Sequence, residues 1–131
     1  NFPPSAMNKN ASTSSIPTAY GTITGWVATT GTYPGSTLSG NGIVAQGTKT
    51  GATLAANIPW TTSLGVTVTV RLMVNGVVVA TGTGVNSSSG GTSTCTTSYN
   101  IVAGDVVTVQ ALSSNGFGTI SAGAGTWVRI T

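Results

Sequence analysis

The stretch VTVTVRLMVNGVVVATGTG, Val66 to Gly84, constrains the fold more than any other part of the chain. Asn75-Gly76 stands between two runs rich in valine, and both residues tolerate the positive φ that a two-residue β-turn requires. The sequence therefore predicts a β-hairpin. On its first arm every second residue is apolar, which predicts one buried face made by Val66, Val68, Val70, Leu72 and Val74.

Similar short patterns follow one another from residue 19 to the end of the chain. ATLAANIPW alternates over residues 52–60, and Pro59 marks the end or an edge of that strand because it has no N–H to donate. Turn residues recur about every eight to twelve positions, and no segment has a helical period. We predict an all-β fold, an antiparallel sandwich of about eight strands with Greek-key or jelly-roll topology, as a single domain over residues 19–131.

Residues 1–18, NFPPSAMNKNASTSSIPT, have no period and contain three of the five prolines. This composition predicts an extended N-terminal arm or linker ahead of the domain. The chain begins with Asn1, which suggests a processed protein or a piece of a longer one. It has no signal peptide and no apolar run as long as a membrane span, so we expect no membrane insertion.

Charged residues are scarce, at 4% of the chain against about a quarter in an ordinary soluble domain. There is no histidine and only one carboxylate side chain, so a Ser-His-Asp triad or a pair of catalytic carboxylates cannot form. We therefore expect no enzymatic activity, no metal site and no cofactor. The net charge of +3 is dispersed along the sequence, which argues against a nucleic-acid partner.

Two single residues have structural interpretations. Asp105 directly precedes an apolar strand, where its carboxylate is expected to accept backbone N–H bonds in an Asx-type turn. Two alternatives are equally open for the arginines: Arg71 or Arg129 forms an ion pair with Asp105, or they are simply solvated. Cys95 is the only cysteine, and we expect a small buried side chain in a strand rather than a reactive thiol.

The aromatic residues are the main candidates for contacts with a ligand or partner. Trp26 and Trp127 lie within predicted strands and are expected in the core. Trp60, beside a proline, and Tyr33, in a loop, are candidates for stacking against sugar rings or a protein partner, with ordinary packing as the alternative. Predicted loop tips at 32–40, 85–92 and 113–117 complete the set of candidate partner or glycan contacts: Tyr33, Trp60, Asn86, Asn115 and Phe117.

The order of these motifs resembles a known family. RLMVNGVVVATG, then IVAGDVVTVQA and a closing GTWVRIT resemble the C1q/TNF-like jelly-roll domains of bacteriophage structural proteins. The front half, with FPPSAMNKN, IPTAYGTITGWVA, YPGS and GNGIVAQG, is similar to the C-terminal domain of minor tail proteins from phages of actinobacteria. The resemblance covers nearly the whole chain and implies a homotrimer, but it carries no defined binding residue onto this sequence.

For such a trimer we expect the polar side of the hairpin to meet a neighbouring subunit, through Thr67, Thr69, Arg71 and Met73. The resemblance implies a virion protein, in the tail or tail tip rather than the head, that contacts other virion proteins and host cell-wall glycan. One alternative is a capsid decoration or head-fibre protein whose N-terminal arm reaches across a neighbour. Another is a secreted carbohydrate-binding module.

Overall fold

In the computed structural model of the chain, which describes residues 2–131, Asn75 and Gly76 form the predicted hairpin turn. Their φ angles are 51° and 82°, and positive φ at both positions is the signature of a type I′ turn. The turn joins β8 (Val66–Val74) to β9 (Val77–Thr81). All five alternate apolar residues of β8 are buried, so the predicted inward face is confirmed.

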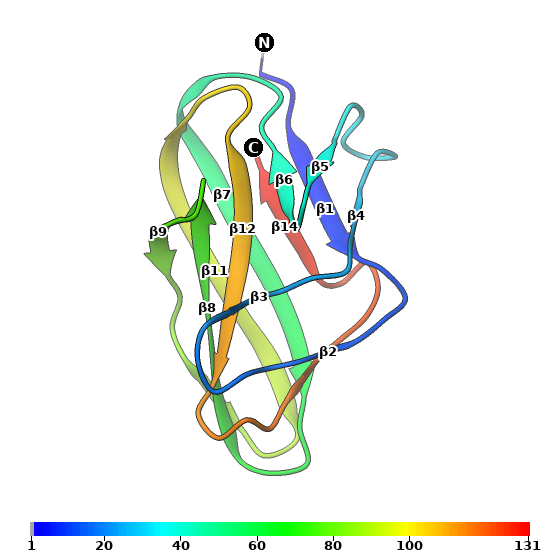
Figure 1. Ribbon diagram of the computed structural model, residues 1–131, viewed down its shortest axis with the longest axis vertical. Helices are drawn as coiled ribbons and strands as arrows, with labels where there is room; N and C mark the ends of the chain where they lie inside the picture. The colour runs from blue at the N-terminus through cyan, green and yellow to red at the C-terminus, as the bar shows by residue number, and fades with distance from the viewer. Residues whose placement is uncertain (1) are drawn as a thin grey trace.

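The strands form two antiparallel sheets packed face to face (Figure 1). The first sheet contains β1 (Ser5–Lys9), β2 (Ser14–Ser15), β4 (Trp26–Ala28), β7 (Lys49–Thr61), β11 (Gly90–Ile101), β13 (Thr119–Ile120) and β14 (Trp127–Ile130). The second contains β3 (Gly21–Thr22), β5 (Leu38–Ser39), β6 (Gly42–Val44), β8, β9, β10 (Val85–Ser87) and β12 (Val106–Ser113). The predicted all-β antiparallel class is confirmed.

Long strands form the frame of each sheet. In the first, β7 pairs with β11 along one side, and with β14 and then β13 along the other. In the second, β8 pairs with β12 on one side and with β9 and β10 on the other. The inward residues of β7 and β8 are apolar at every second position, and so are those of β12 except Ser113 at its end; together they form the core between the sheets.

Pro59 lies inside β7 rather than at its end. Its carbonyl accepts a hydrogen bond from the Ser121 N–H at 3.0 Å. In an antiparallel strand the N and O of one residue point to the same side, so the missing N–H of Pro59 faces the interval between β13 and β14. The strand continues past proline because no ladder bond is required at that position.

The N-terminal segment differs from the expected arm. β1 lies between β14 and β4, with Ser5 opposite Ile130 and Lys9 opposite Trp26. Met7 points into the core and is fully buried, and β2 pairs with β13. The sequence does not predict this strand because SAMNK has only one strongly apolar inward residue, and a single residue makes no alternating pattern.

Short pairings raise the number of strands above the eight expected, since seven of the fourteen strands have two or three residues. The 85–92 stretch, expected as a loop tip, instead forms β10 and the start of β11, with only residues 88–89 as the turn. Cys95 is buried in β11, as predicted. Residues 2–131 contain no helix that is long and apolar enough to cross a membrane.

Candidate functional site

Three turns gather at one end of the sandwich, the lower end in Figure 1: residues 62–65, 88–89 and 114–118. Hydrogen bonds join them. The Asn115 side-chain amide donates to the Gly65 carbonyl at 2.9 Å, and the Thr62 N–H donates to the Ser89 carbonyl at 3.1 Å. This end is therefore a connected surface and not three independent loops.

A groove of about 430 Å³ runs across this surface between residues 61–63 and 116–119, and it reaches Ser15 of β2. We call it the loop-end groove. Its lining carries no charged residue and five hydroxyl groups, from Ser15, Thr61, Thr62, Ser63 and Thr119. Phe117 also lines the groove, with 44% of the residue exposed. The groove thus combines an accessible aromatic ring with neutral hydrogen-bonding groups.

The turn that presents Phe117 is held by its own polar groups. The buried Ser113 hydroxyl accepts a hydrogen bond from the Gly116 N–H at 3.1 Å and donates to the Phe117 carbonyl. The Asn115 side chain accepts from the Phe117 N–H at 3.0 Å, which is an Asx-type turn. Asn115 therefore orients the Phe117 backbone and also ties the turn to Gly65.

The other predicted contact residues lie elsewhere. Asn86 is exposed on β10, at the edge of the second sheet, where its amide donates to the Thr67 hydroxyl at 2.8 Å. Tyr33 is half-buried in the loop between β4 and β5, and its ring centroid lies 5.6 Å from the Arg129 guanidinium carbon. Neither residue lines the loop-end groove. Of the five candidates, the structure brings only Asn115 and Phe117 together.

Trp60 is not a surface residue. It is 1% exposed, and its indole N–H donates to the Ser93 hydroxyl at 2.9 Å, which in turn donates to the Val68 carbonyl at 2.8 Å. This chain of bonds crosses from the first sheet to the second. Because β7 continues through Pro59, its alternation directs Trp60 inward, so the alternative of core packing is the correct one.

The predicted interface residues lie on the outward side of β8. Thr67, Thr69, Arg71 and Met73 are all half-buried. Arg71 is already engaged within the chain, because its guanidinium carbon lies 3.8 Å above the centre of the Tyr20 ring and its Nε donates to Gln110 at 2.8 Å. Trp127 is also half-buried rather than in the core, and Arg129 stacks on it at 3.7 Å.

Asp105 forms the predicted turn. One carboxylate oxygen accepts from the Val102 N–H and the other from the Asn75 side-chain amide, both at 2.9 Å. The arginines stack on aromatic rings instead of pairing with it. Burial raises the pKa of the Cys95 thiol, which keeps it protonated at neutral pH. The described residues contain no cluster of three or more potential metal-ligating side chains.

Lys9 is a residue that sequence analysis missed. It is 1% exposed, and its ammonium donates to the Ser14 hydroxyl at 2.8 Å and to the Thr24 carbonyl at 2.7 Å. Burial lowers the pKa of this amine from its ordinary value of 10.5. The alternation of SAMNK was the available signal, since the side chain two residues after the inward Met7 also points inward.

The chain matches no protein-family model and none of the curated proteins searched. It is similar to the solved structure of Eiger TNF from S. frugiperda, with a TM-score of 0.67 and 12% sequence identity. The match covers 98% of this chain and 90% of that one. At this identity the likeness establishes the fold, a TNF-like jelly roll, as the sequence predicted.

Proposed function

We propose that this chain is a non-enzymatic binding domain of a bacteriophage virion, located in the tail or tail tip, which assembles as a homotrimer and contacts the host surface. The placement in a phage tail rests on the sequence motifs that resemble minor tail proteins. The TNF-like fold agrees with the C1q/TNF-like part of that resemblance.

A binding role without catalysis fits the chemistry that the chain offers. The loop-end groove is lined by hydroxyls, glycines and Phe117, none of which titrates near neutral pH. The only carboxylate side chain, Asp105, is engaged in the turn that joins β11 to β12. General acid–base catalysis needs a group poised to exchange protons, and this groove has none.

The observation that favours a glycan ligand is the exposed Phe117 ring above a groove rich in hydroxyls. A sugar ring has an apolar face that packs on an aromatic ring and hydroxyls that exchange hydrogen bonds with neutral polar groups. The rigid turn around Asn115 limits the entropy lost on binding. In a trimer, three such grooves would bind a repetitive surface with greater avidity than one.

Light scattering coupled to size exclusion tests the assembly. We expect a mass three times that of the 12.9 kDa chain at micromolar concentration. A stable monomer would contradict an autonomous trimer, and would favour either the carbohydrate-binding module or a domain that is trimeric only within a longer chain.

Pull-down on purified host cell-wall fragments tests the contact. We expect the wild-type chain to bind and Phe117→Ala to lose most of that binding, while Tyr33→Ala, at the other aromatic candidate, keeps it. Binding to phage capsids but not to cell walls would favour the decoration protein. The decoration-protein alternative requires a free N-terminal arm, but β1 and β2 of that segment pair with β14 and β13 in the first sheet.

A further inference from the structure

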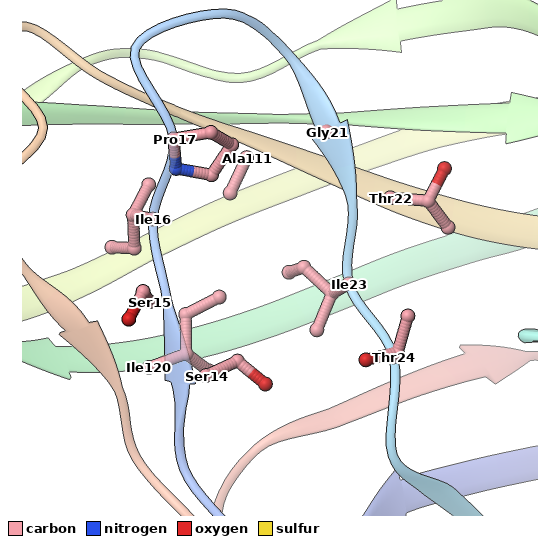
Figure 2. A pocket seen from close by; sticks show the side chains of 10 residues that line it. All are labelled: Ser14, Ser15, Ile16, Pro17, Gly21, Thr22, Ile23, Thr24, Ala111 and Ile120. Carbon is pink, nitrogen blue, oxygen red and sulfur yellow. The ribbon is translucent and has the colours of Figure 1, made fainter.

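Residues 14–24 form a U-shaped segment on the flank of the sandwich, whose two arms do not pair with each other. A cavity of about 410 Å³ lies between these arms (Figure 2). The outgoing arm contains β2, which belongs to the first sheet, and the returning arm contains β3, which belongs to the second. The arms meet at one end, where a Cβ on Gly21 would lie 2.8 Å from Pro17 Cγ. We call this space the flank cavity.

The flank cavity has one apolar end and one polar end. Pro17 and Ala111 line the closed end, where the two arms meet, and the Ile23 side chain extends between the arms (Figure 2). Ile120 lies beside Ser14, so apolar surface reaches the other end as well. At the other end the hydroxyls of Ser14 and Thr24 turn toward each other from opposite arms (Figure 2). Its volume falls within the range of about 300–1,000 Å³ typical of small-molecule sites.

Main-chain groups also face this space. The Ile16 N–H donates to the Gly118 carbonyl and the Ile23 N–H to the Val109 carbonyl, both away from the cavity. Because successive residues of a strand point their main-chain groups to opposite sides, those of Ser15 and Thr22 face the cavity.

The polar end carries an uncompensated positive charge. The Lys9 ammonium bridges Ser14 and Thr24, which both line the cavity, and these two bonds use two of its three N–H donors. Lys9 is the only charged residue among the buried ones that the structure describes. The chain's single carboxylate side chain, Asp105, is bound to Asn75 and Val102, so it cannot serve as the counter-charge.

A buried cation without a counter-ion is unfavourable, and an anion bound beside it offsets that cost. We propose that the flank cavity binds a small organic carboxylate with an apolar body. The carboxylate lies at the Ser14–Thr24 end, where the Ser14 hydroxyl is able to donate to it, and the Lys9 ammonium lies 2.8 Å from that hydroxyl oxygen and supplies the counter-charge. The apolar body packs on Ile23, Ile120 and Ala111. This inference is independent of the proposed tail function and of the loop-end groove.

An NMR titration of the ¹⁵N-labelled chain tests it, with hexanoate as the probe and hexan-1-ol as the neutral probe of equal chain length. We expect saturable shifts of the Ser15, Thr22 and Thr24 amides with hexanoate, and at least about tenfold weaker binding of hexan-1-ol, because a charge-assisted hydrogen bond is lost. Lys9→Met should weaken hexanoate binding by a similar factor. The matched control Lys49→Met, at an exposed lysine, should leave it unchanged.

A second variant keeps the test decisive if Lys9→Met disturbs the fold. Ile23→Phe adds bulk inside the cavity and retains Lys9, so it should abolish the hexanoate shifts while the rest of the spectrum stays dispersed. Equal binding of hexanoate and hexan-1-ol, or hexanoate shifts that persist in Ile23→Phe, would overturn the proposal. Absence of any saturable shift in the wild-type chain would overturn it as well.

Discussion

Trp60 is buried and Phe117 is exposed, so replacing them with alanine should lower the stability by very different amounts. Trp60→Ala leaves a large cavity between the sheets and removes the donor to Ser93, so we expect a loss of about 3–5 kcal/mol in the free energy of unfolding. Phe117→Ala removes a ring that is 44% exposed, and should cost less than about 1 kcal/mol. Urea unfolding followed by circular dichroism measures both. A Trp60→Ala protein as stable as the wild type would contradict the buried position.

Lys9 gives the stability of the chain a pH dependence. Its pKa is lowered in the folded chain, whereas in the unfolded chain it keeps the ordinary value of 10.5. Between these two pKa values the unfolded chain binds more protons, so the free energy of unfolding rises with pH. Below both values Lys9 is charged in both states, and the folded state carries the full cost of the buried charge.

We therefore expect the wild-type chain to gain stability relative to Lys9→Met as the pH rises from neutral toward 10.5. Urea unfolding of both proteins across this range measures the difference, and groups common to both cancel. A difference that stays constant with pH, or that changes in the opposite direction, would show that Lys9 is not buried as a charged group.

Among the elements, the β8–β9 turn is connected to the β11–β12 turn through one side chain. Asn75 has positive φ, its amide donates to Asp105, and its side-chain oxygen accepts from the Val106 N–H at 3.0 Å. Asn75→Ala loses both bonds and places alanine in the left-handed region, so we expect a destabilisation of about 2–3 kcal/mol. Thermal or urea unfolding measures it. Asn86→Ala is the control, because that exposed residue makes one side-chain bond, and it should cost less than about 1 kcal/mol.

At the scale of the whole molecule, the proposed trimer requires a subunit interface. The outward side of β8, with Thr67, Thr69, Arg71 and Met73, is the predicted contact. A buried, unpaired carboxylate there should dissociate the proposed trimer, because its desolvation has no compensation. We expect Thr69→Glu to give a monomer by light scattering, whereas Thr96→Glu, on the outward side of β11 in the other sheet, keeps the trimer. The reverse result would place the interface on the first sheet.

Local patterns were sufficient to predict much of this fold. The alternation of β8 predicts its buried face, Asn75-Gly76 predicts the turn, and the position of Asp105 ahead of an apolar strand predicts its role in a turn. These features depend on residues that are near each other in sequence. The candidate site was less predictable: Phe117 and Asn115 are predicted contact residues, but the groove that Phe117 forms with residues 61–63 has no signal in the sequence.

The sequence by itself determined the all-β class, the central hairpin and the alternating faces, because side-chain direction in a strand follows a period of two whatever the strand pairs with. Only the tertiary structure decided which strands are neighbours. It placed β1 between β14 and β4, directed Lys9 inward, and enclosed Trp60 between the sheets. The loop-end groove is made by segments about fifty to a hundred residues apart, and the flank cavity is completed by Ala111 and Ile120, about a hundred residues from its two arms. No local pattern encodes such contacts.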